Sequence, residues 1–133
     1  MNILKAFHKK QQAQQIKNYA PIVPSGLIAH TESGYFYIKD NKKFTFVSDR
    51  AMLSWNLPII KTKDSIMSSK IKSGILGFRD GTLVKDISDG KIYLISNSKR
   101  RHVVDPDVLE WLNTDIIQIG QKELFVHSEG EKL

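Results

Sequence analysis

The side chains most often used in catalysis and metal binding occur in this sequence, but not at spacings that would assemble a site locally. The four histidines (His8, His30, His102 and His127) show neither His-x₃-His nor His-Glu-x-x-His spacing, and the chain has no cysteine. Such short spacings bring two imidazoles onto one metal ion. We therefore expect no metal site, and we expect His30 and His102 to be packing residues.

Two pairs of carboxylates could serve acid–base chemistry, and a local structural role explains each of them. Asp105 and Asp107 flank a proline, where helix capping and the helix dipole favour acidic residues. Asp86 and Asp89 belong to a turn that is too short for an EF-hand loop. The sequence has no Gly-x-Ser-x-Gly elbow and no glycine-rich phosphate-binding loop. These observations predict a protein that is not an enzyme and that carries no cofactor.

Length and composition are those of a folded protein with one ordinary domain or two very small ones. The chain has 133 residues, of which 41% are hydrophobic and 26% charged. No apolar run reaches the roughly 18 residues needed to span a bilayer, and the N-terminus lacks the apolar core of a signal peptide. We therefore expect synthesis in a cytoplasm, no secretion through a signal peptide and no membrane partner.

Positive charge is concentrated at the N-terminus. Four lysines (Lys5, Lys9, Lys10 and Lys17) precede the first acidic residue, Glu32, whereas the whole chain has a net charge of +6. Helix-favouring residues predict a helix up to Pro21, although the apolar side chains fall on two opposite sides of it. Such a segment suits docking into another subunit, and a terminus without fixed structure is the alternative. The expected docking residues are Ile3, Leu4, Phe7, Lys9, Lys10 and Ile16.

The same pattern occurs twice in the chain, and this duplication is its main organising feature. The aligned pairs include Gly26 with Gly81, Tyr37 with Tyr93, Phe46 with Val103, Trp55 with Trp111 and Met67 with Leu124. The offset grows from 55 to 57 residues through short insertions, and the tryptophan pair is one position out of step with its neighbours. We predict a basic helical arm at 1–24, a first β-rich unit at 25–76 and a second at 77–133.

Each unit is predicted to be a three-stranded meander with a short helix, which gives a mainly β (β-rich α+β) fold. Apolar and β-branched runs are interrupted by Asp40–Asn41 and by Asn97–Ser98, residue types that favour tight turns. Ser48 and Asp105 stand where a helix N-cap is expected. The expected strands are Leu27–Ala29, Tyr35–Lys39 and Phe44–Val47, and then Leu83–Lys85, Lys91–Ile95 and Arg101–Val104.

A basic cluster, Lys99, Arg100 and Arg101, follows the turn of the second unit. Alternation along a strand would expose some of these side chains at a solvated hairpin edge, where charge blocks unwanted strand pairing. A patch that binds phosphate or another polyanion is the alternative. Aromatic residues on the preceding strands, Tyr37 and Tyr93, could contact a glycan at equivalent places in the two units.

The second unit resembles a short repeat found in phage virion proteins and in some bacterial surface or wall-associated proteins. The resemblance lies in Asp80–Lys85, Gly90–Ile95, Lys99–Val103 and Pro106–Leu109. It extends to the first unit only through the internal alignment, because Thr45 stands where the pattern has histidine and Asp49 where it has proline. The resemblance implies a binding or assembly module and supplies no catalytic residue.

Three functions follow as hypotheses. The first is a non-enzymatic structural protein of a phage virion, associated with the tail, neck or fibre and assembling with other virion proteins as a homo- or hetero-oligomer. The second is a module that binds cell wall or glycan. The third is a nucleic-acid-binding accessory protein that uses the basic cluster together with the arm.

Overall fold

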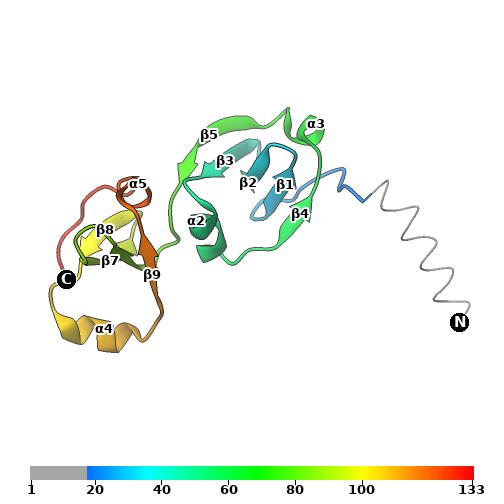
Figure 1. Cartoon of the computed structure of the whole chain (residues 1–133). Coiled ribbons are helices and arrows are strands. Elements are labelled where there is room, and N and C mark those ends of the chain that lie inside the picture. Colours follow the sequence, from blue (N-terminus) through cyan, green and yellow to red (C-terminus); the bar gives the residue numbers. More distant parts are fainter. Residues whose placement is uncertain (1–17) are drawn as a thin grey trace, which may run out of the picture. The chain divides into compact units, whose positions relative to one another are not determined.

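The computed structural model describes residues 18–133 and has a mainly β fold, as predicted (Figure 1). It contains two sheets, with the strand orders β4-β1-β2-β3-β5 and β8-β7-β6-β9. The predicted arm at 1–24 lies almost wholly outside the described residues. The strands are β1 (Ile28–Thr31), β2 (Gly34–Lys39), β3 (Lys42–Phe46), β4 (Ile59–Lys61), β5 (Ile71–Leu76), β6 (Leu83–Asp86), β7 (Ile92–Ser96), β8 (Lys99–His102) and β9 (Ile116–Ile119). The helices are α2 (Asp49–Ser54), α3 (Asp64–Met67), α4 (Pro106–Leu112) and α5 (Gln121–Leu124).

Each sheet is built on the predicted antiparallel meander. Two residues connect β2 to β3 and β7 to β8, and φ is positive at Asp40, Asn97 and Ser98. Such turns match the twist of the strands that they join, and Asn and Asp tolerate this backbone conformation. The local turn chemistry therefore fixes both hairpins.

A parallel strand closes each meander, a pairing that the sequence pattern did not predict. β4 pairs with β1, and β9 pairs with β6 in the same relative register, Ile59 lying beside Ile28 and Ile116 beside Leu83. The crossover from the third strand passes through α2 in one case and α4 in the other. A connection of this length is what a parallel pair requires. α3 and α5 then follow β4 and β9, although neither helix was predicted.

Strand pairing corrects the alignment of Tyr37 with Tyr93. Tyr37 lies opposite Ile28, whereas Leu94 lies opposite Leu83, so the counterpart of Tyr93 is Phe36 and not Tyr37. The turn before β7 therefore contains two inserted residues rather than one. The same offset of 57 persists through the helices, because the N-caps are Ser48 and Asp105.

The offset of 57 between α2 and α4 is one residue more than the offset of 56 that matches the two tryptophans. Both helices are followed by a residue with positive φ, Asn56 after α2 and Asn113 after α4. The residue before each asparagine is Trp55 in one case and Leu112 in the other. Trp111 is therefore the counterpart of Ser54, and the two tryptophans occupy different positions in the repeat.

The described chain divides into two compact units that are not consecutive stretches of sequence. Residues up to 44 and 57–73 belong to the first unit, and residues 45–56 and 74–133 to the second. α2 is thus part of the second unit, although it follows the first meander in sequence. The sequence-based boundary between 76 and 77 remains a prediction about where the repeats meet.

Equivalent positions fill the cores of the two units. The first core contains Val23, Ala29, Phe36, Ile38 and Met67. The second contains Phe78, Val84, Ile95, Ile119 and Leu124, with Tyr93 packed against it. Because side chains alternate along strands, these residues lie on one face of each sheet. The second core also receives Ala51 from α2, with Val47 packed beside it.

A buried histidine joins the start of the second unit to its C-terminal segment. His127 accepts a hydrogen bond at Nε2 from the Phe78 backbone N–H (2.9 Å), and its Nδ1 lies 2.7 Å from the Ser98 carbonyl oxygen. Since only a protonated Nδ1 can donate to that carbonyl, the ring is the neutral Nδ1–H tautomer. Burial lowers the pKa of His127 below its ordinary value. A Cβ on Gly77 would lie 2.2 Å from Nε2, so this close approach requires glycine.

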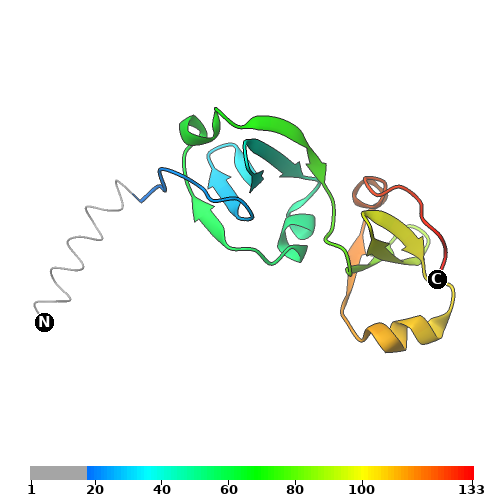
Figure 2. The same cartoon turned by 180° about the vertical axis from the view of Figure 1, so that it is seen from behind.

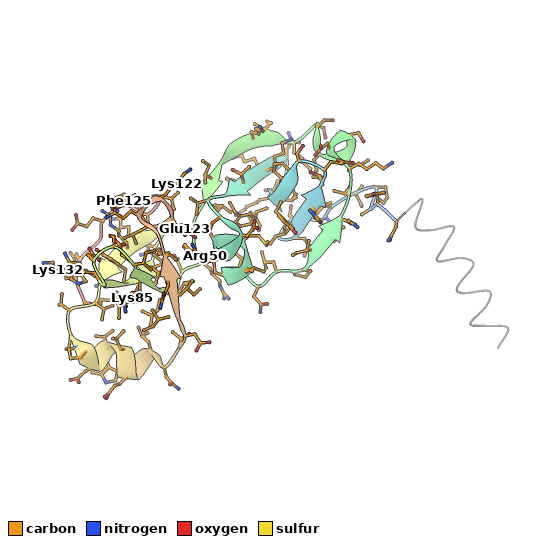
Figure 3. The ribbon with its side chains drawn as sticks, in the orientation of Figure 1. Arg50, Lys85, Lys122, Glu123, Phe125 and Lys132 are labelled. Atoms are coloured by element: carbon orange, nitrogen blue, oxygen red, sulfur yellow. The ribbon has the colours of Figure 1, made fainter. Side chains whose placement is uncertain are left out.

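A second polar contact attaches α2 to α5 within the same unit (Figure 3). The Glu123 carboxylate accepts hydrogen bonds from Ser48 Oγ (2.7 Å) and from the Arg50 guanidinium, and it also receives the Gly120 backbone N–H. Burial raises the pKa of Glu123, but the bonds from Ser48 and Arg50 outweigh it and lower the pKa overall.

In residues 18–133, no helix is long and apolar enough to cross a membrane.

Candidate functional site

The second unit contains a polar hollow of about 270 Å³ at one end of its sheet. β6, β7 and β8 contribute Asp86, Tyr93 and His102 to it. Tyr93 lies opposite His102, while Asp86 lies opposite Lys91, two residues before Tyr93 and on the same face of the sheet. Residues of α5 and of the C-terminal segment complete the wall. The lining residues are Asp86, Asp89, Lys91, Tyr93, Arg100, His102, Gln121, Phe125, Glu129 and Lys132.

Asp86 is a buried carboxylate that lines the hollow. Its Oδ1 accepts hydrogen bonds from the Ser88 backbone N–H (2.8 Å) and from Ser88 Oγ (2.7 Å). The side-chain hydroxyl of Ser88 and then its backbone N–H lower the pKa of Asp86. Gln121 Nε2 donates in turn to Ser88 Oγ (3.0 Å), which connects α5 to the turn. The carboxylate therefore stays ionised, and its contacts hold the turn in place.

Aromatic rings form part of the wall. The rings of Tyr93 and His102 have centroids 5.4 Å apart at an interplanar angle of 38°. The guanidinium of Arg100 lies 5.0 Å from the centroid of the Phe125 ring and donates to the carbonyl oxygen of His127. Burial, followed by the nearby charge of Asp89, raises the pKa of Tyr93. Its phenol therefore stays protonated at neutral pH and can both donate and accept a hydrogen bond.

Charged groups of both signs surround these rings. Lys91, Arg100 and Lys132 supply positive charge, while Asp86, Asp89 and Glu129 supply negative charge. Arg100 and Asp86 have the structural contacts described above, and Asp89 Oδ1 accepts a hydrogen bond from the Lys91 backbone N–H (2.9 Å). Phe125 and Lys132 can be located in Figure 3 on the second unit. The chemistry available is hydrogen bonding and ring stacking toward a small polar ligand.

The volume limits the size of such a ligand. Ligand pockets for drug-sized molecules usually measure about 300–1,000 Å³. At about 30 Å³ for each water in the liquid, a hollow of about 270 Å³ would hold about nine waters. A single sugar ring or one amino-acid-sized group fits this space.

The first unit has the same backbone frame but different residues at these positions. The strand register aligns Asp86 with Thr31, Tyr93 with Phe36 and Arg100 with Lys43. Thr31 nonetheless repeats the local contact of Asp86, since its Oγ1 accepts from the Ser33 backbone N–H (3.1 Å). The frame is thus duplicated, while the combination of charged and aromatic residues around the hollow belongs to the second unit.

The structure separates the residues of the predicted polyanion patch. Arg100 lines the hollow, whereas Lys99 and Arg101, as its neighbours along β8, have side chains on the opposite face of the sheet. The Arg101 side chain donates to the Glu131 carbonyl oxygen (2.9 Å). Lys99, Arg100 and Arg101 therefore do not form one continuous basic surface on the second unit.

The two predicted glycan contacts also differ in their surroundings. Tyr93 lines the hollow, while Tyr37 lies on the other face of its own sheet beside Phe44, with ring centroids 6.1 Å apart. His30 lies on the same face as Tyr37 and stacks on Tyr35 at 4.3 Å. The expected docking residues of the arm, Ile3 to Ile16, lie outside the described residues.

Several residues of the hollow were not singled out from the sequence. Gln121, Phe125, Glu129 and Lys132 come from α5 and from the C-terminal segment, about thirty residues after β7 and β8. The segment returns to the sheet through reciprocal backbone bonds with Arg100, which donates to the Ser128 carbonyl and accepts from Gly130 N–H. No short motif encodes such a return. The many polar and charged residues of this segment indicated only that it is exposed to solvent.

Within residues 18–133, no cluster of three or more histidines and carboxylates is arranged to hold a metal ion. No protein-family model matches the chain, and no curated protein and no solved structure matches it significantly. Functional proposals for this chain therefore rest on its own sequence and geometry.

Proposed function

We propose that this protein is a non-enzymatic structural and assembly protein of a phage virion, associated with its tail, neck or fibre. The proposal is based on one backbone arrangement that occurs in both units with different exposed side chains. Two units with equivalent cores and different exposed side chains would give one chain two binding surfaces, each on a β-sheet of its own. The resemblance of the second repeat supports the virion setting, and the basic arm supplies a further docking segment.

Particle composition tests this proposal directly. Particles would be purified on a density gradient from cells that carry the gene, washed in high salt and analysed by mass spectrometry. We expect the chain to remain with the particles in a fixed ratio to the other virion proteins. A chain that appears only in the soluble fraction, or that the salt wash removes, would contradict the virion proposal.

Binding of a glycan or of cell wall is the second candidate, and the hollow around Tyr93 is the observation that favours it. Aromatic rings can stack on the apolar face of a sugar, while carboxylates, an amide and lysines hydrogen-bond its hydroxyl groups. Retention of the purified protein on cell wall would be compared for wild type, Tyr93→Ala and Tyr37→Ala. We expect Tyr93→Ala to lose retention and Tyr37→Ala, a matched change outside the hollow, to keep it.

Because Tyr93 packs against the core, a second variant separates binding from folding. Lys132 lies at the rim of the hollow and is exposed, so Lys132→Ala should weaken retention without unfolding the unit. Equal retention of wild type, Tyr93→Ala and Lys132→Ala would rule out this site.

Nucleic-acid binding remains the third candidate, and the arrangement of β8 does not favour it. Arg100 lies over the Phe125 ring, and the half-buried Arg101 donates to the Glu131 carbonyl oxygen, which leaves Lys99 as the exposed residue of the cluster. Binding through phosphate contacts would weaken steeply as salt is raised. A DNA mobility shift that is absent at low salt would remove this candidate.

A further inference from the structure

The positions that α2 buries in the core are not buried on α4, its counterpart in the second repeat. α2 contributes Ala51 to the core of the second unit, with Val47 packed against that core. α4 contributes no buried residue. Since the N-caps Ser48 and Asp105 align, the counterparts of Val47 and Ala51 are Val104 and Val108.

These counterparts and a neighbouring tryptophan are apolar residues on or beside α4: Val108 and Trp111 lie on the helix, and Val104 directly precedes its N-cap. Val104 is 55% exposed and Trp111 is 74% exposed. Trp111 lies one turn after Val108 on the helix, so the two side chains share a face. α4 and α5 lie at opposite ends of β9, and none of the three apolar residues lines the hollow (Figures 1 and 2). We call Val104, Val108 and Trp111, with the acidic residues described next, the α4 surface.

The charge of this segment is uniformly negative. Between His102 and Lys122 the chain has four acidic residues and no lysine or arginine. All four acidic side chains are exposed. An exposed tryptophan in a segment whose charged residues are all acidic favours a partner that is apolar and basic. The four residues are Asp105, Asp107, Glu110 and Asp115.

The N-terminal arm of the chain has this complementary composition. Its lysines at positions 5, 9, 10 and 17 occur without any acidic residue before Glu32. Its apolar residues include Ile3, Leu4 and Phe7. The arm thus carries as many positive charges as this segment carries negative ones, and its apolar residues could contact Trp111 in a complex.

We propose that the α4 surface binds the N-terminal arm of a second copy of this chain. The inference rests on the assembly role proposed above and names the acceptor of the arm. Each chain then carries one donor, the arm, and one acceptor, on the second unit. A heterologous contact of this kind joins copies head to tail and can close a ring or extend a row.

Within the second unit, α2 provides an internal example of the same type of contact. Its helix combines a small apolar contact, Ala51 in the core, with an ion pair between Arg50 and Glu123. On α4 the sign is reversed, because Asp107 occupies the position of Arg50. A helix at this place in the repeat is therefore suited to bind a partner through combined apolar and ionic contacts, and on α4 that partner must supply the positive charge.

Sedimentation equilibrium on the full-length chain tests the proposal through charge reversal. The acceptor variant is Glu110→Lys with Asp115→Lys, which leaves the cap at Asp105 intact. The donor variant is Lys9→Glu with Lys10→Glu. The matched control is Glu131→Lys, an exposed acidic residue of the same unit outside the α4 surface.

We expect the wild-type mass to rise with protein concentration between about 1 and 200 μM, which covers the weak affinities of transient contacts. Each reversed variant should weaken association at least about tenfold. The combination of donor and acceptor variants should restore it, because the signs are again complementary. Glu131→Lys should associate like wild type, and Trp111→Ala should weaken association without a change of charge.

Three results would overturn the proposal. Wild type could remain monomeric across this range, which includes the case of an arm that binds its own chain. Association could persist unchanged in the acceptor variant. It could also be lost in both single variants and not return in the combination. Particle composition is measured in a separate experiment. The virion proposal can therefore fail while the self-association is confirmed, or be supported while the self-association is absent.

Discussion

Replacing Glu123 by glutamine removes one negative charge and almost no volume from the contact between α2 and α5. The carboxylate is 8% exposed and accepts from Ser48 Oγ at 2.7 Å, a bond to a charged group in a partly buried setting. Such a bond contributes about 1.5–3 kcal/mol. The Arg50 side chain is 55% exposed, so its ion pair with Glu123 is screened by water and contributes about 0.2–1 kcal/mol. We expect Glu123→Gln to lower the free energy of unfolding by about 2 kcal/mol at neutral pH.

Urea unfolding followed by tryptophan fluorescence measures this loss. The indole N–H of Trp55 donates to the Gly77 carbonyl oxygen (2.9 Å), so Trp55 reports on the second unit. The exposed Trp111 is best replaced by phenylalanine in both proteins, which leaves one reporter. Arg50→Ala in the same background should cost less than about 1 kcal/mol, because the pair is screened.

The pH dependence of the same measurement has a defined sign. The pKa of Glu123 is lowered from its ordinary value of 4.5, so the unfolded chain takes up the proton first as pH falls. Its contribution is therefore present above the unfolded value and is lost as pH falls through the lower, folded value. Glu123→Gln should remove that part of the pH dependence. A loss below about 0.5 kcal/mol at pH 7, or an unchanged pH profile, would refute the role assigned to this carboxylate.

Three further predictions concern the same unit. Burial lowers the pKa of His127, so the contribution of this residue to stability should be present above about pH 6.5 and decline as pH falls below it. Urea titrations at pH 7.5 and 5.5 check this. His127→Gln should reduce the difference in the free energy of unfolding between the two pH values. Gly77→Ala should cost about 2–3 kcal/mol, because its Cβ would lie 2.2 Å from the His127 ring, whereas Gly120→Ala, with nothing within 4 Å, should cost less than half as much. Trp111→Ala should change the free energy of unfolding by less than about 0.5 kcal/mol in dilute protein, since the side chain is 74% exposed; a larger loss in thermal or urea unfolding would mean that it packs within the unit.

Much of the fold follows from local sequence signals. The two-residue turns at Asp40–Asn41 and Asn97–Ser98 and the N-caps at Ser48 and Asp105 are where they were predicted. The third strand of each meander was predicted two residues too late, because β3 and β8 begin directly after the turn. Each turn and each cap depends on a few adjacent residues whose backbone preferences agree. For that reason the meanders could be predicted without knowing what they pack against.

Register within the duplication could not be fixed in the same way. One inserted residue or two before β7 both place apolar residues on alternate positions, so the pattern matched Tyr93 to Tyr37. The backbone pairing of β7 with β6 shows that two residues are inserted, so the counterpart of Tyr93 is Phe36. A shift of one residue moves every side chain to the other face, which is why only Tyr93 of the two tyrosines lines the hollow.

The sequence by itself determined the duplication, the hairpins, the helix starts and the segregation of positive charge into the arm. Each is set by neighbouring residues or by composition. The tertiary structure alone decided that α2 belongs to the second core, that α4 leaves its apolar surface exposed, and that α5 and the C-terminal segment complete a hollow with β7 and β8. Those outcomes depend on which distant surfaces bury one another, and contacts across tens of residues leave no local pattern in the chain.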